Sequence, residues 1–176
     1  MSARIQVSLR VNAGADRAFD VFVNEIGKWW RPNALFSFTP RSPGVLAFEP
    51  GPDGRLTETL PNGKVFEIGR ITAWEPGVRL AFTWRQATFA PDQITHVDVR
   101  FEPVGDQTRV TVEHTGWETV PPEHVARHGF PDAIFLQRHG EWWQALLKSF
   151  KGRFGQTAHG APGRPAQRAD RTNGEQ

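Results

Sequence analysis

The amino-acid sequence predicts an α+β domain in which helices cover one face of an antiparallel sheet. One alternating segment and one segment of helical spacing open the chain. From Pro43 to about His114, short alternating segments are separated by turns rich in Gly, Pro, Asn and Asp. Near the end, a run of roughly 20 residues carries large apolar side chains at every third or fourth position. Strands and helices that are segregated in this way are typical of α+β folds.

The first segment is predicted to form one strand and one helix. Residues 4–11 alternate polar and apolar types, which indicates a half-buried strand. Apolar residues then recur at helical spacing from Ala15 to Trp29, so an amphipathic helix is expected there, with a break at Gly27. Pro32 ends it, because the residue before a proline avoids helical backbone angles.

The middle of the chain is predicted to form six strands. The turns between them contain the sequences GPDG, PNG, PG and VGDQ. Gly69 lies inside the third of these strands and indicates a β-bulge. Alternation places apolar residues on one face only, so one face of the sheet is expected to be covered. The expected strands are residues 44–50, 55–60, 64–75, 78–85, 94–102 and 108–114.

The last ordered element is predicted to be a helix from Asp132 to about Phe154, roughly 30 Å long at 1.5 Å per residue. Residues 155–176 are Gly, Pro, Ala and polar types with little to bury, which predicts a disordered tail after a single domain over residues 1–154. The residues expected on the covered face of this helix are Phe135, His139, Trp142, Trp143, Leu146, Leu147 and Phe150.

Composition excludes several classes of function. The chain has no Cys and no Tyr, so disulfides, thiol catalysis, cysteine-bound zinc and tyrosine acids are absent. The net charge is +2 and no dense Lys/Arg cluster carries interleaved aromatics, which argues against nucleic-acid binding. No apolar run approaches the roughly 20 residues of a membrane span, and the start lacks the apolar core of a signal peptide. A cytoplasmic protein is expected.

Motifs for catalysis, cofactors and metals are not found. Neither a G-x-S-x-G nucleophile motif nor a Gly-rich phosphate loop occurs, so we assign no catalytic residue and expect no cofactor. His124 and His128 have the spacing of two metal ligands on a helix, but a third ligand is not evident. No metal is therefore expected.

Several segments of the chain carry a likeness to a known group of proteins. They are Phe19–Phe22 with Trp29–Trp30, Gly69–Ile71, Trp74–Pro76, Arg79–Trp84, Val110–Trp117, His139–Gly140, Trp142 and Leu146. Together with the order of elements, they resemble the helix-grip or START-like (SRPBCC) superfamily. Within it, the chain resembles the family named after the C-terminal domain of the activator of the ninety-kilodalton heat-shock protein ATPase. The resemblance implies a curved sheet around the last helix, with a deep cavity between them.

Four of the seven tryptophans form two adjacent pairs. Neighbouring residues on a helix point about 100° apart, so one ring of each pair can pack inside while the other borders an opening. Two ordinary core residues with two flanking partners are an equally weighted alternative. The residues expected to line the ligand cavity are Trp29, Trp30, Phe48, Phe66, Phe82, Trp84, Val99, Val112, His114, Phe135, His139, Trp142, Trp143 and Leu146.

Polar residues on or beside apolar faces are candidates for orienting a ligand. His114 and His139 are the first two, although a backbone carbonyl could satisfy either one. Glu67 and Arg70 could instead form a structural pair, and Glu58 lies between apolar neighbours. A further signal is the unfavourable Gly140 inside the helix, which suggests a close approach by a neighbour or ligand.

The function expected from these features is the binding of a small hydrophobic or aromatic ligand. Two alternatives remain open. One is a co-chaperone-like or regulatory module with a protein partner or a homodimeric state. The other is an enzyme that uses His114, His139 and a carboxylate for acid–base chemistry on a lipophilic substrate.

Overall fold

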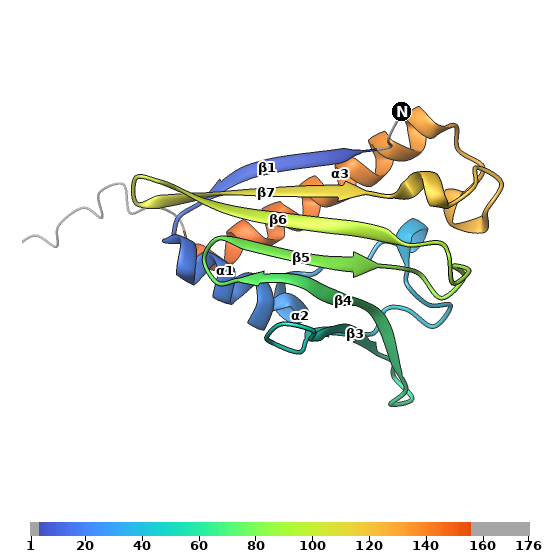
Figure 1. Cartoon of the computed structure of the whole chain (residues 1–176), viewed down its shortest axis with the longest axis horizontal. Helices are drawn as coiled ribbons and strands as arrows, with labels where there is room; N and C mark the ends of the chain where they lie inside the picture. The colour runs from blue at the N-terminus through green and yellow to red at the C-terminus, as the bar shows by residue number, and fades with distance from the viewer. Residues whose placement is uncertain (1–3, 156–176) are drawn as a thin grey trace, which may run out of the picture.

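The protein forms one curved antiparallel sheet with helices across one face (Figure 1). The computed structural model describes residues 4–155. The seven strands follow the order β1-β7-β6-β5-β4-β3-β2. The predicted α+β helix-grip fold is thus confirmed. The strands are β1 (Ile5–Val11), β2 (Val45–Phe48), β3 (Arg55–Thr59), β4 (Val65–Glu75), β5 (Arg79–Trp84), β6 (Thr95–Val104) and β7 (Gln107–Thr115). The helices are α1 (Ala15–Asn24), α2 (Ile26–Trp29) and α3 (Asp132–Lys151), with short 3₁₀ turns η1 (Ala34–Phe36), η2 (Trp117–Thr119), η3 (Val125–Arg127) and η4 (Gly152–Phe154).

A bulge in β4 bends the sheet where the sequence predicted it. Leu56 pairs with Gly69 and Thr57 pairs with Glu67, which leaves Ile68 without a partner in β3. At Gly69 an added Cβ would lie 1.8 Å from the carbonyl oxygen of Thr83. Only glycine fits this approach of two backbones. Bulges increase local twist, and this one helps to curl the sheet toward the helices.

The first helical segment is interrupted at Glu25 rather than at Gly27, which corrects the expected position of the break. Glu25 has φ −114° and ψ 19°, outside the helical region, and α2 restarts at Ile26. Gly27 lies inside α2 against β2, where an added Cβ would be 3.0 Å from the carbonyl oxygen of Leu46. Its role is therefore close packing. Arg153 donates to the Glu25 carboxylate at 2.6 Å, and this hydrogen bond lowers the pKa of Glu25.

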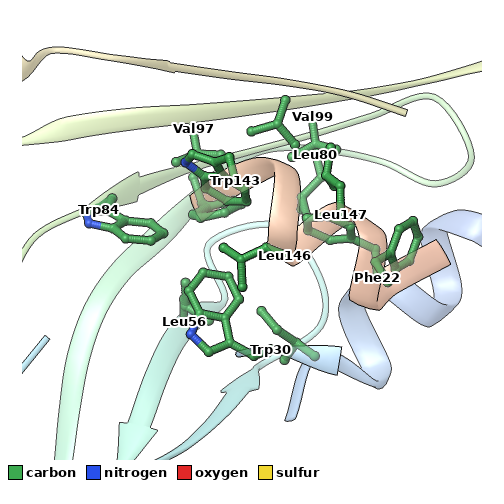
Figure 2. Packing of buried hydrophobic residues seen from close by; sticks show 14 of the residues in the cluster. Phe22, Trp30, Leu56, Leu80, Trp84, Val97, Val99, Trp143, Leu146 and Leu147 are labelled. Atoms are coloured by element: carbon green, nitrogen blue, oxygen red, sulfur yellow. The ribbon is translucent and has the colours of Figure 1, made fainter. Parts of the chain in front are cut away.

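Helix α3 lies across the concave face of the sheet, as expected, and ends at Lys151 with η4 continuing to Phe154 (Figure 1). All seven of its predicted core residues are buried. Figure 2 shows Trp143 and Leu147 directed toward Val97 and Leu80 of the sheet. A large-to-small change at such buried positions costs about 2–5 kcal/mol of stability. Among residues 4–155, no helix combines the length and apolar character that a bilayer span needs.

Two expectations have different outcomes. Gly140 is not closely approached, because an added Cβ would lie 3.7 Å from Ile5 Cγ2, an ordinary contact. The expected close neighbour at Gly140 is therefore wrong. The predicted disordered tail, apart from Gly155, lies outside the described residues.

Candidate functional site

A cavity of about 290 Å³ lies beside α3, between the segment of residues 31–44 and the edge formed by β2 and β3. Its lining includes four aromatic side chains, Trp30, Trp142, Phe36 and Phe38. Leu46 and Glu58 contribute from the sheet edge, and polar side chains of the 31–44 segment complete the lining. The hollow therefore combines aromatic rings with polar groups, of which Glu58 is the acidic one.

The aromatic walls are held in place by ring packing. The rings of Phe36 and Trp142 stack with centroids 5.2 Å apart and planes 20° from parallel. Trp30 packs edge-to-face on Trp142 at 5.4 Å, and lies 6.0 Å from Phe38. Offset-stacked and edge-to-face pairs are the favoured geometries of aromatic rings. The cavity walls thus support one another.

Two hydrogen bonds fasten the chain after α2 to α3. The Trp142 indole N–H donates to the carbonyl oxygen of Arg31 at 3.0 Å. About two turns further along α3, the Ser149 hydroxyl donates to the carbonyl oxygen of Trp29 at 2.6 Å. These bonds satisfy backbone carbonyls that leave the helix end, and they fix the position of Trp30 between them.

Glu58 is 1% exposed, yet it lines the cavity. One carboxylate oxygen, Oε1, accepts from the Thr39 hydroxyl at 2.8 Å. The other, Oε2, accepts from the Ser42 hydroxyl at 2.6 Å and from the Gly44 N–H at 3.3 Å. All of these donors are neutral, and no ion pair within residues 4–155 includes Glu58.

His114 is a structural histidine in a continuous hydrogen-bond chain. The Trp143 indole N–H lies 3.1 Å from His114 Nδ1, which must accept, so Nε2 carries the proton. That proton is donated to Thr95 Oγ1 at 2.8 Å, and the Thr95 hydroxyl donates to the carbonyl oxygen of Trp84 at 3.0 Å. Burial, and then the charges of His139 and His96, lower the pKa of His114 well below its ordinary value. Both ring nitrogens are therefore occupied.

His139 has a different environment. It is fully buried, and neither of its ring nitrogens has a hydrogen-bond partner. Burial lowers its pKa from 6.5 to about 3, so the ring is neutral. Its ring lies 4.5 Å from Phe36 and 5.0 Å from Trp117, centroid to centroid. Phe36 thus has His139 on one side and the cavity on the other.

A family model described as Activator of Hsp90 ATPase homolog 1-like protein matches residues 12–155. The chain belongs to this family. The family resemblance seen in the sequence is confirmed. No curated protein matches the chain.

Solved structures with the same fold cover nearly the whole described chain. Protein MLL2253 from Mesorhizobium loti is 16% identical, with a TM-score of 0.59 over 85% of this chain and 94% of that one. Protein CV1439 from Chromobacterium violaceum is 16% identical, with a TM-score of 0.58 over 86% and 97%. The Aha1 dimer from Colwellia psychrerythraea is 16% identical, with a TM-score of 0.57 over 86% and 95%. At this identity the likeness shows the fold.

In this Aha1-like fold, the expected ligand-lining residues occupy four places: the cavity, two separate grooves and the interior. Trp30 and Trp142 line the cavity. Phe48 faces a groove beside α2, and Phe66 lies half-buried in a groove on the other side of β3, with the Arg85 guanidinium 5.0 Å above its ring. The remaining ten are buried in the interior, where seven aromatic or imidazole rings pack together with three aliphatic side chains. These ten are Trp29, Phe82, Trp84, Val99, Val112, His114, Phe135, His139, Trp143 and Leu146.

The other polar candidates lie away from the cavity. Glu67 and Arg70 form an ion pair at 2.9 Å, with the Arg70 side chain 62% exposed. His124 Nε2 bonds the carbonyl oxygen of Thr88, and His128 bonds that of Leu35. Within residues 4–155, no three His, Asp or Glu side chains gather into a metal site.

The sequence reasoning did not find Phe36, Phe38, Thr39 and Ser42. They lie in a segment without helical or strand periodicity, so no pattern assigned them a face. One signal was present: two phenylalanines in a segment otherwise rich in Pro, Asn and Ser must be buried against something.

Proposed function

We propose that the protein binds a small apolar or aromatic molecule in the cavity between residues 31–44, the β2–β3 edge and Trp142. The observation that carries the proposal is the hollow of about 290 Å³ with Trp30, Trp142, Phe36 and Phe38 in its walls. Ligand sites are typically concave and mostly apolar, with a few polar groups that orient the ligand. Their volumes are roughly 300–1,000 Å³, so a molecule with one or two rings would suit this cavity.

The rigidity of the walls supports the same proposal. Trp30 and Trp142 are both largely buried, and the Arg31 carbonyl oxygen fixes the Trp142 indole. A preformed site does not have to order its side chains when the ligand arrives, which improves affinity. Flat rings also offer stacking partners for a flat ligand.

A cavity-filling substitution tests the proposal. Ala34 is an exposed residue that lines the cavity, so Ala34→Trp should fill the hollow without removing a core contact. Ala133 is exposed in the first turn of α3 and provides the matched control, Ala133→Trp. We would titrate 1-naphthylmethanol, 1-naphthylmethylamine and 1-naphthoic acid by calorimetry and measure the melting temperature. At least one compound should bind the parent protein and Ala133→Trp, but not Ala34→Trp. Absence of binding by all three, or equal binding by Ala34→Trp, would overturn the proposal.

A further inference from the structure

We propose that the ligand of this cavity is a base: a small aromatic or lipophilic amine whose protonated nitrogen is recognised by Glu58. This inference rests on the proposed function and assigns the chemical class of the ligand. It depends on three features of the site: the buried Glu58 carboxylate has no cationic partner, one of its oxygens can accept another hydrogen bond, and aromatic side chains line the cavity.

Glu58 is a buried acid with neutral neighbours. Its carboxylate is held by two hydroxyls and one backbone N–H, from Thr39, Ser42 and Gly44. Buried charges in proteins are normally paired with an opposite charge, because neutral donors offset only part of the lost hydration. No cationic side chain pairs with Glu58 within the described chain. A cationic ligand would supply the missing charge.

The carboxylate has room for one more donor. A carboxylate oxygen offers about two acceptor positions. Oε2 already accepts from Ser42 and Gly44, whereas Oε1 accepts only from Thr39. Because Glu58 also lines the cavity, the remaining position on Oε1 is the natural partner for a ligand N–H. An ammonium group carries only donors, so it suits an acceptor of this kind.

The aromatic walls favour the same charge. The face of an aromatic ring is electronegative and attracts a cation within about 6 Å of its centroid, most strongly when the ring is indole. Trp30, Trp142, Phe36 and Phe38 all contribute to the cavity lining. A carboxylate ligand would be repelled by the Glu58 carboxylate and would gain nothing from the electron-rich rings of the lining. An uncharged ligand would gain stacking but no charge pairing.

Glu58 also has a structural role, since its three bonds join residues 39–44 to β3. Gly44 lies so close to it that an added Cβ would be 2.6 Å from Glu58 Cγ. A purely structural Glu58 would affect stability but would not rank ligands by charge. The test therefore measures charge preference.

The three naphthyl compounds named above share one ring system and differ in their polar group. On the parent protein, 1-naphthylmethylamine should bind about tenfold or more tightly than 1-naphthylmethanol, and 1-naphthoic acid should bind most weakly. Glu58→Gln should reduce the advantage of the amine over the alcohol to about threefold or less. The ranking of the three compounds on the parent protein needs no variant, so it decides the matter if Glu58→Gln does not fold.

The outcomes separate the two proposals. Binding that is blocked by Ala34→Trp but is as tight for the alcohol or the acid as for the amine would overturn the amine assignment and leave ligand binding intact. An amine preference that survives in folded Glu58→Gln would also overturn it. Failure of all three compounds to bind would overturn both proposals.

Discussion

His114 and His139 lie in the buried interior with their ring centroids 5.0 Å apart, and only His114 has hydrogen-bond partners for its ring nitrogens. Both are neutral in the folded protein because burial lowers the pKa of each ring. Both histidines therefore make the folded protein less stable as the pH falls, but only His114 takes part in the hydrogen bonding of the interior. Neither lines the cavity.

Stability should fall as the pH is lowered from about 6.5. The pKa of His139 is about 3 in the folded chain and 6.5 in the unfolded chain, so between these values only the unfolded chain binds the proton. Its stabilising contribution is complete above pH 6.5 and decreases toward pH 3. For His139 the expected slope is about 1.4 kcal/mol per pH unit, or about 2 kcal/mol at pH 5, and His114 acts in the same direction. Urea unfolding at pH 7, 6 and 5 measures it. The lowered pKa of Glu25 affects stability only below about pH 4.5, outside the range of pH 5 to 7 in which unfolding is measured.

Substitution by leucine should distinguish the two histidines. His139→Leu removes two unpaired nitrogens, so we expect unchanged or higher stability at pH 7 and a shallower pH dependence. His114→Leu leaves the Trp143 indole N–H without its acceptor and should cost about 1–3 kcal/mol at pH 7. Unfolding free energies of the two variants at pH 7 and 5 provide the comparison. A large loss of stability in His139→Leu at pH 7 would contradict this account.

Gly140→Ala should stabilise the protein by about 1 kcal/mol, because glycine is unfavourable inside a helix and the new Cβ meets only an ordinary contact at Ile5. Gly69→Ala makes the same substitution at a position where the opposite effect on stability is expected. There the new Cβ would collide with the Thr83 carbonyl oxygen, and a loss of about 3 kcal/mol or more is expected. Chemical denaturation of both variants tests the pair, and a destabilised Gly140→Ala would indicate that the helix packs more tightly at this point.

The two members of the second tryptophan pair should affect different properties. Trp143→Phe leaves His114 Nδ1 without a donor in the core and should cost about 2–3 kcal/mol of stability. Trp142→Phe loses one hydrogen bond to Arg31 and should cost about 1 kcal/mol. It should also weaken 1-naphthylmethylamine binding about three- to tenfold, more than Trp143→Phe does. Denaturation and calorimetry on both variants would show whether stability and binding separate in this way.

Most of the fold could be predicted because its elements carry periodic patterns. Leu80, Phe82 and Trp84 alternate and lie on the covered face of β5, and Gly69 marked the bulge. The break at Glu25 could not be predicted, because α2 is set by its packing on β2 rather than by a local signal. Periodicity in the sequence predicts which face of a helix or strand is buried. It does not identify the residues, distant in the sequence, that pack against that face.

The candidate site shows the same limit. Alternation and helical spacing identified buried aromatic residues, and most of these fill the interior. The cavity instead depends on how residues 31–44 cross the sheet edge, which has no periodic signature. Glu58 was noticeable only as an acid between apolar neighbours; its three donors come from a segment 14 to 19 positions away.

The bonds from Trp142 to Arg31 and from Ser149 to Trp29 join residues 111 and 120 positions apart. During synthesis the N-terminal partners emerge from the ribosome long before α3 exists, so the hollow cannot acquire its final outline until α3 has been made. The outline of the cavity is therefore completed only when α3 docks onto segments that were made well before it.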